Sequence, residues 1–295
     1  MTTHTIDTTR LCVGYEEHHP EGRRSVVLLH GWPDSLRTWD AIAPGLAALG
    51  WRVIVPALRG FLPTRFLHDD TPRTGQLSAL GRDLIEFIDA LQLQRPALVG
   101  HDWGARAAAN ACGLRPGVAS HLAMLSVGYG TNLPSQTLGM EQIRQYWYHW
   151  FMATPLGQRT VRQQRQAFAR TMWDTWSPPG WFTEADFEAA AAAFEHDDWP
   201  QVTVHSYSHR WGHAPGDPAY DADEALLNPA PVLDLPTLVL HGEQDLVNLP
   251  AGSAGKEAYF RGPYQRQLLP GVGHFPQRED PAQVLAHLAQ WLGPA

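Results

Sequence analysis

The sequence predicts an α/β fold, in which a helical cap is inserted into a mostly parallel, doubly wound sheet. Short apolar runs bounded by turn residues alternate with helical patterns through residue 130, and this alternation returns after residue 231. Between residues 131 and 231 the strand signal disappears, and the chain becomes helical, aromatic and interrupted by prolines. We therefore expect a core domain of residues 1–130 and 232–295 and a cap of residues 131–231.

Most of the expected strands are short, continuous runs of Val and Leu, as in strands that helices cover on both faces. The expected strands are Ser25–Leu29, Trp51–Pro56, Ala97–Gly100, His121–Ser126, Thr237–Leu240 and Gln265–Leu269. Apolar residues that recur every three or four positions predict amphipathic helices between them. The expected helices of the core are Leu77–Leu91, Gly104–Leu114 and Pro281–Leu292, and those of the cap are Glu141–Thr154, Thr183–Phe194 and Gln201–Trp211.

Composition excludes several classes of partner. The chain of 295 residues has a formal net charge of -8, which gives no basic surface for nucleic acid, and it has no apolar run long enough to span a membrane. Residues 1–10 lack the pattern of a secretion signal, so we expect a cytoplasmic protein. Only Cys12 and Cys112 are present, too few for a disulfide framework or a cysteine metal site.

The most informative motif is Gly100-His101-Asp102-Trp103-Gly104, between an expected strand and an expected helix. This is the pattern of a nucleophile elbow with aspartate at the nucleophile position. The flanking glycines are needed because the nucleophile occupies a sharp, strained turn where side chains would collide with backbone. A carboxylate displaces a leaving group at an sp³ carbon, and water must then cleave the alkyl ester. Epoxides and alkyl halides are therefore the expected substrates, and a serine esterase is disfavoured.

Three further motifs supply the partners that this chemistry needs. His30-Gly31-Trp32-Pro33 follows an early strand, and we expect the backbone N–H groups of Trp32 and Trp103 to form an oxyanion hole. Asp245 lies just after a late strand, and His274 lies in a glycine-rich turn after the next one. We expect His274 to activate water as a general base and Asp245 to orient it. Glu243 is the competing acid.

With these motifs the chain resembles the epoxide hydrolase and haloalkane dehalogenase branch of the α/β-hydrolases, over nearly its whole length. The H-G-x-P, H-D-W-G, G-x-x-D and G-H motifs at residues 30–33, 101–104, 242–245 and 273–274 have the family's order and spacing. The resemblance implies hydrolysis through a covalent ester on Asp102, without metal or organic cofactor. Epoxide hydrolase, forming a vicinal diol, is the preferred interpretation.

Epoxide hydrolases use two cap tyrosines to donate hydrogen bonds to the ring oxygen. Tyr207 resembles the second of these tyrosines. The first should lie in residues 145–151, where the alignment favours Trp147 and leaves Tyr146 or Tyr148 as substitutes. An indole N–H can also donate one hydrogen bond.

A haloalkane or haloacid dehalogenase is the main alternative. In those relatives the tryptophan after the nucleophile, here Trp103, binds the halide, and a cap His-Trp pair with a tyrosine can do the same, as His149, Trp150 and Tyr207 could here. Arg106 matches one of two arginines that grip the carboxylate of haloacetates, and Trp103 replaces the other. A carboxylate-bearing substrate is therefore not expected.

Two alternatives belong to other classes. A non-catalytic ligand-binding protein on the same fold would need no triad. A metal hydrolase would depend on sequences such as His18-His19 or Glu195-His196-Asp197-Asp198, none of which has the H-E-x-x-H form. The expected partners are therefore water and a small, mostly apolar electrophile, bound by a monomer or homodimer.

Overall fold

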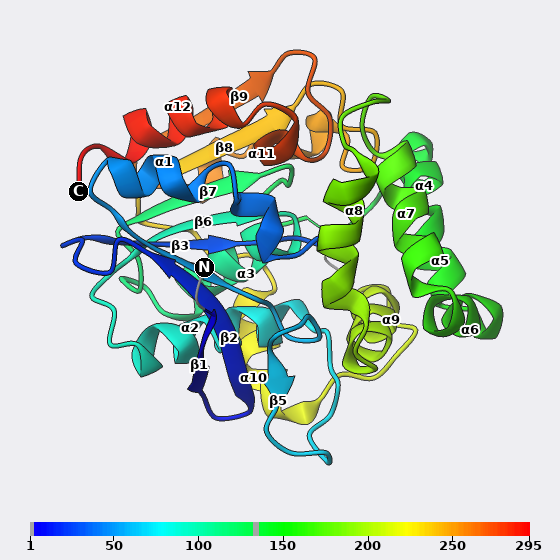
Figure 1. Cartoon of the computed structure of the whole chain (residues 1–295). Coiled ribbons are helices and arrows are strands. Elements are labelled where there is room, and N and C mark those ends of the chain that lie inside the picture. Colours follow the sequence, from blue (N-terminus) through cyan, green and yellow to red (C-terminus); the bar gives the residue numbers. More distant parts are fainter. Residues whose placement is uncertain (1–2, 132–135) are drawn as a thin grey trace.

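The computed structural model describes residues 3–131 and 136–295, and within them the strands form a single sheet (Figure 1). Its order is β1-β2-β4-β3-β6-β7-β8-β9, with β5 paired to β2. The strands from β4 to β9 along this order are parallel, and β1, β2 and β5 pair antiparallel. The strands are β1 (Thr3–Asp7), β2 (Leu11–His18), β3 (Ser25–Leu29), β4 (Arg52–Pro56), β5 (Arg65–Phe66), β6 (Ala97–His101), β7 (His121–Leu125), β8 (Thr237–Gly242) and β9 (Tyr264–Leu269).

Helices cover both faces of this sheet, as the continuous apolar strands predict. Val27 and Leu29 of β3 pack into a core with α2 (Leu77–Ala90) and α3 (Trp103–Leu114). The alternate residues Val26 and Leu28 pack on the opposite face with α1 (Ala43–Ala48) and α12 (Pro281–Leu292). Figure 1 shows these two helical layers on either side of the sheet. The predicted doubly wound α/β architecture is confirmed.

The predicted cap region is helical between residues 136 and 231, and Figure 1 shows most of it beyond one end of the sheet. Residues 132–135, at its expected start, lie outside the described residues. Its helices are α4 (Met140–Gln145), α5 (Trp147–Met152), α6 (Pro155–Gln163), α7 (Arg165–Thr175), α8 (Glu184–Ala191), α9 (Asp198–His209) and α10 (Asp221–Leu227). The last of them, α10, packs on α2 and α3 of the sheet layer. The domain boundaries at residues 131 and 231 remain a prediction.

The remaining elements are short. They are α11 (Pro276–Glu279) and the 3₁₀ helices η1 (Leu36–Trp39), η2 (Ala192–Phe194), η3 (Pro218–Tyr220), η4 (Pro250–Ser253) and η5 (Glu257–Tyr259). Within the described ranges, no helix is both long and apolar enough to cross a lipid bilayer.

Several features differ from the sequence prediction. The expected helix Glu141–Thr154 is two helices, because the chain turns at Tyr146, where φ is -85° and ψ is 23°. The expected helix Gln201–Trp211 begins earlier, at Asp198. The antiparallel strands β1 and β2 were not predicted. Nearly every residue of β1 is exposed, so this edge strand carries no apolar signal.

Candidate active site

The predicted nucleophile, Asp102, lies in the sharp turn between β6 and α3. Its φ of 47° and ψ of -111° place it in a conformation that non-glycine residues rarely adopt. The glycines on either side permit this turn. A Cβ atom at Gly100 would lie 2.3 Å from backbone atoms of Gly104, and one at Gly104 would lie 2.3 Å from the Leu29 carbonyl oxygen. The steric reason given for the glycines in the motif therefore holds.

A backbone donor already faces the Asp102 carboxylate. The Trp32 N–H donates to Asp102 Oδ1 at 3.0 Å. Trp103 is the first residue of α3, so its N–H has no acceptor within the helix. Gly31 allows the close approach, because a Cβ there would lie 2.6 Å from Asp102 Cβ. This geometry supports Trp32 and Trp103 as the oxyanion-hole donors, although that role remains a prediction.

Contacts to the cap and to α11 hold the loop that carries Trp32. Asp34 is fully buried and forms a two-pronged ion pair with Arg278, with nitrogen–oxygen distances of 2.6 and 2.7 Å. Burial alone would raise the pKa of Asp34, but the Arg278 charge and hydrogen bonds hold it below its usual value. The Trp173 indole of α7 donates to the Pro33 carbonyl at 2.8 Å. The position of the Trp32 N–H is therefore fixed from two sides.

His274 and Asp245 form the predicted pair. His274 Nδ1 lies 2.9 Å from Asp245 Oδ2, and both side chains are buried. The other Asp245 oxygen accepts the backbone N–H groups of Val247 and Asn248, each at 2.9 Å. The competing acid Glu243 is exposed to solvent. Asp245, rather than Glu243, is thus the carboxylate placed to orient the histidine.

The protonation states suit a general base. Burial alone would lower the pKa of His274, but the Asp245 carboxylate outweighs it and raises the pKa above 6.5. Asp245 is also buried, yet His274 and His241 hold the pKa of Asp245 well below its usual value. When Nδ1–H donates to Asp245, Nε2 carries the lone pair. Nε2 has no hydrogen-bond partner in the described part of the chain, so it is free to accept a proton.

Glu279 holds the backbone around His274, which sequence analysis did not anticipate. It accepts the N–H groups of Gly273 and Phe275 at 2.6 and 2.8 Å and the Ser177 hydroxyl at 2.7 Å. The Ser177 oxygen in turn accepts the His274 N–H at 2.8 Å. Glu279 follows the G-H motif by five positions, and this spacing is the sequence signal that could have indicated its role. Glu279 is therefore a positioning residue.

We expect Glu279→Gln to lower kcat about tenfold or more, because a hydrogen-bonded charge contributes roughly 1.5–3 kcal/mol. Since the Glu279 charge raises the pKa of His274, its loss should also move the acid limb of the kcat profile to lower pH. The pH dependence of kcat measures both effects. Glu188→Gln, on the exposed side of α8, is the matched control. A fall in kcat with an unmoved acid limb would reduce Glu279 to a structural role.

Two cap tyrosines lie beside the nucleophile. Tyr207 of α9 and Tyr148 of α5 are buried, and their ring centroids are 5.2 Å apart. The Tyr207 hydroxyl accepts the Trp103 indole N–H at 3.0 Å, which leaves its own O–H free to donate. Burial raises the pKa of both phenols well above 10, and the Asp102 charge raises them further. Both phenols therefore stay protonated at neutral pH.

The alignment that favoured Trp147 as the first oxygen donor is not supported by the geometry. Trp147 is 41% exposed, and its ring packs on Tyr148, Phe151 and Phe168. The hydroxyl of Tyr146 donates to Asn248 Oδ1 at 2.7 Å, on the side of the acid loop. Of the three candidates for the first oxygen donor, Tyr148 is the one whose ring lies against Tyr207.

The two indole groups proposed for halide binding are already engaged in hydrogen bonds. The Trp103 indole N–H is bound to Tyr207, and the Trp150 indole donates to the Ile143 carbonyl at 3.0 Å. His149 Nδ1 accepts the Trp211 indole at 3.0 Å, and burial keeps the pKa of His149 well below 6.5. His149 is therefore neutral. The indoles of Trp103 and Trp150 are therefore withdrawn from the halide site that the sequence allowed, whereas the His149 Nε2–H group has no acceptor among the described residues.

Within residues 3–131 and 136–295, no three His, Cys, Asp or Glu side chains lie close enough together to hold a metal ion. In the acidic run proposed as an alternative, Asp198 instead pairs with Arg73 at 2.9 Å and with His196 at 3.0 Å.

Comparisons with known proteins agree with the α/β-hydrolase fold. The family model of the alpha/beta hydrolase fold matches residues 24–281. The crystal structure of a candidate epoxide hydrolase from Klebsiella pneumoniae is similar over 98% of this chain and 96% of that chain, with 34% identity and a TM-score of 0.92.

Two curated relatives differ in how much of their length is matched. Epoxide hydrolase A of Mycobacterium tuberculosis is 24% identical over an alignment of 325 positions, gaps included, which covers 99% of this chain and 97% of that protein. The epoxide hydrolase of Caballeronia sordidicola is 40% identical over 92 residues, or 31% of this chain. That second match spans only 27% of the relative's length.

Proposed function

The chain belongs to the α/β-hydrolase family, and from that premise we propose that it is an epoxide hydrolase that forms a vicinal diol through an ester on Asp102. The names of its relatives and the placement of Asp102, His274 and two cap tyrosines support this proposal. No step of the proposed reaction draws on a metal or an organic cofactor.

In the first step, an Asp102 carboxylate oxygen bonds to a ring carbon of the epoxide, and the bond from that carbon to the ring oxygen breaks. The ring oxygen takes a proton from Tyr207 or Tyr148 and becomes a hydroxyl group. Burial raises the pKa of both phenols, so both carry their protons when the substrate binds, and the alkoxide that forms is a stronger base than a phenolate. The products of this step are a hydroxyalkyl ester and a tyrosinate.

In the second step, His274 Nε2 takes a proton from water, and the hydroxide attacks the carboxyl carbon of the ester. The Trp32 and Trp103 N–H groups bind the oxyanion that forms. When the intermediate collapses, the departing alkoxide takes the proton from His274, and the diol leaves. The Asp102 carboxyl proton returns to the tyrosinate, which restores the enzyme.

The observation that carries the proposal is the hydrogen bond from the Trp103 indole to the Tyr207 hydroxyl. It engages the Trp103 indole, which is one of the donors that a departing halide would use. It also orients the Tyr207 hydroxyl so that its proton is available to an oxygen leaving group. The same residue pair therefore favours an epoxide over an alkyl halide.

Turnover of matched substrates tests the proposal. The purified protein is incubated separately with styrene oxide and with n-butyl bromide, and diol and bromide are quantified by chromatography. We expect phenylethanediol from the epoxide and no bromide release. Bromide release alone would assign a dehalogenase instead. Saturable binding of styrene oxide without any product would assign a binding protein.

The pH dependence should separate the two steps. Hydrolysis of the ester needs neutral His274, whose raised pKa means that the base is lost as pH falls. We expect kcat to fall on the acid side with a midpoint above 6.5, the ordinary histidine value. The alkylation step, reported by kcat/KM, needs no base and should lack this limb. Asp245→Asn should move the limb to lower pH, and an acid limb of equal midpoint in both parameters would contradict this assignment.

A further inference from the structure

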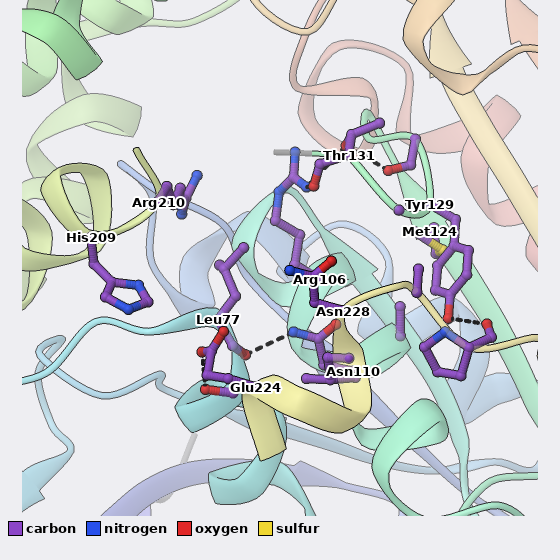
Figure 2. A pocket seen from close by; sticks show the side chains of 17 residues that line it. Leu77, Arg106, Asn110, Met124, Tyr129, Thr131, His209, Arg210, Glu224 and Asn228 are labelled. Atoms are coloured by element: carbon purple, nitrogen blue, oxygen red, sulfur yellow. Dashed lines mark hydrogen bonds between the residues drawn. The ribbon is translucent and has the colours of Figure 1, made fainter. Parts of the chain in front are cut away.

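A cavity of about 130 Å³ lies between α3, the end of α9 and the segment 128–131, and Asp102 does not line it. Figure 2 shows Arg106 and Thr131 together on one side of it, with His209 and Arg210 coming from the cap. Much of the remaining wall is apolar. It includes Leu77, Ala109, Met124, Leu227, Ala230 and Pro231. The cavity therefore combines two guanidinium groups with an apolar surface.

Both arginines are buried and incompletely hydrogen-bonded. Arg106 is 6% exposed and donates from Nη1 to the carbonyl and hydroxyl oxygens of Thr131, each at 3.0 Å. Arg210 is 4% exposed and donates from Nη2 to the Ser206 hydroxyl at 3.0 Å. In the described part of the chain, the Nε–H group of each arginine is buried without an acceptor. A guanidinium normally uses its planar array of donors more fully when it is buried.

Across residues 3–131 and 136–295, neither arginine of the cavity is directly paired with a carboxylate. Glu224, the acid in the cavity wall, accepts the Ser78 hydroxyl and Gln76 Nε2. Burial lowers the pKa of His209, so it does not add charge at neutral pH. Two buried cations that lack a directly paired carboxylate are unfavourable, and an anion bound between them would relieve this.

We propose that this cavity binds a carboxylate between Arg106 and Arg210, as the head group of a short ligand with an apolar body. A cavity of this size is comparable with one of about 150 Å³ that accommodates benzene. A carboxylate would accept from the ends of the two guanidinium groups, and its short chain would lie on the apolar wall. The carboxylate belongs either to a free organic acid or to one end of a substrate.

Arg210 connects this cavity with the candidate active site. Its guanidinium carbon lies 4.5 Å from the Tyr207 ring centroid and 5.4 Å from that of Trp103, as in cation–π contacts. Because these are the two rings joined by the hydrogen bond at the nucleophile, a ligand on Arg210 acts directly next to the oxygen donor. Binding to the cavity is nevertheless independent of the proposed function, since it requires no turnover.

The test compares butyrate with butyramide, which has almost the same shape and no charge, by isothermal titration calorimetry. We expect butyrate to bind at least about tenfold more tightly, and Arg106→Met and Arg210→Met each to weaken butyrate about tenfold or more. Arg159→Met, an exposed arginine on α6, is the control and should bind butyrate like the wild type. Equal binding of the acid and the amide, or unchanged binding by Arg210→Met, would overturn the proposal.

Thermal unfolding shows whether the Arg210→Met variant is folded. Because methionine removes an unpaired buried charge and keeps the side-chain length, Arg210→Met without ligand should have an unchanged or higher Tm. Butyrate should raise the Tm of the wild type more than that of this variant. If the two proteins gain the same Tm from butyrate, Arg210 is not part of its site.

The source of the carboxylate is decided by turnover of the epoxide of allylacetic acid and its methyl ester. A preference of about tenfold in kcat/KM for the acid, lost in Arg210→Met, identifies the substrate's own carboxylate. Equal kcat/KM values with retained butyrate binding identify a separate organic acid, and either result supports the site. Styrene oxide turnover is measured in parallel, so failure of the proposed function is seen separately from failure of butyrate binding.

Discussion

Replacing His274 with glutamine is expected to stop the reaction after the first chemical step, so that the protein accumulates as an alkyl ester. Glutamine cannot accept a proton from water, whereas the nucleophile Asp102 and its Trp32 donor remain in place. A general base contributes roughly 10²- to 10⁴-fold, so multiple-turnover hydrolysis should fall by about 10³-fold. Intact-protein mass spectrometry after incubation with styrene oxide should show the protein mass increased by one whole epoxide.

Two control variants test whether the adduct is an ester on Asp102 and whether its accumulation is due to the loss of His274. Asp102→Ala should form no adduct, which would place the ester on that carboxylate. His287→Gln, on α12, removes a histidine that has no role in the site and should turn over styrene oxide like the wild type without an adduct. An adduct that persists in Asp102→Ala would exclude Asp102 as the nucleophile. Undiminished turnover by His274→Gln would exclude His274 as the base.

The core of the site was predictable because each part belongs to a short motif at a strand end. Asp102, Asp245 and His274 follow β6, β8 and β9, and parallel strands bring their carboxyl ends to one edge of the sheet. Glycines lie in the motifs of Asp102 and His274, and the steric reason for those beside Asp102 can be stated from the sequence alone. For such positions, local sequence and sheet topology together specify the geometry.

The cap was harder to predict because its side chains are placed by helix phase. One residue along a helix turns the side chain by about 100°, so Trp147 and Tyr148 point in very different directions. Which of them faces the site depends on where α5 begins, and that is set by the turn at Tyr146. Spacing within the aromatic run contains no information on this turn.

Side chains that meet from distant segments of the chain also could not be predicted from the sequence. Sequence analysis found Arg106 but no second arginine at the position expected from haloacid dehalogenases, and it therefore rejected a carboxylate-bearing ligand. The fold brings Arg210 of the cap to the same cavity. Glu279 similarly reaches Ser177 only because α7 ends over the turn that carries His274. Such pairs depend on packing between elements rather than on any motif.

Removing the two cap phenols is the second change with a large expected effect. Tyr148→Phe and Tyr207→Phe should each slow the alkylation step about 10²-fold, and the double variant more, because the ring oxygen would leave without a proton donor. Single-turnover tryptophan fluorescence can follow this step, since the Trp32 ring stacks on Tyr148 at 5.7 Å and lies edge-on to Tyr207 at 5.0 Å. Hydrolysis of the ester, once formed, should change much less.

Stability distinguishes the two tyrosines from each other. Tyr207→Phe leaves the buried Trp103 indole N–H without its acceptor, which should cost about 1–3 kcal/mol and lower Tm. The Tyr148 hydroxyl has no hydrogen-bond partner among the described residues, so Tyr148→Phe should leave Tm nearly unchanged while it slows alkylation. Tyr264→Phe, which removes an unpartnered hydroxyl on β9, serves as the control for both measurements. If both cap variants alkylate at the wild-type rate, proton donation by the cap is excluded, and the ring oxygen must obtain its proton from water or from another side chain.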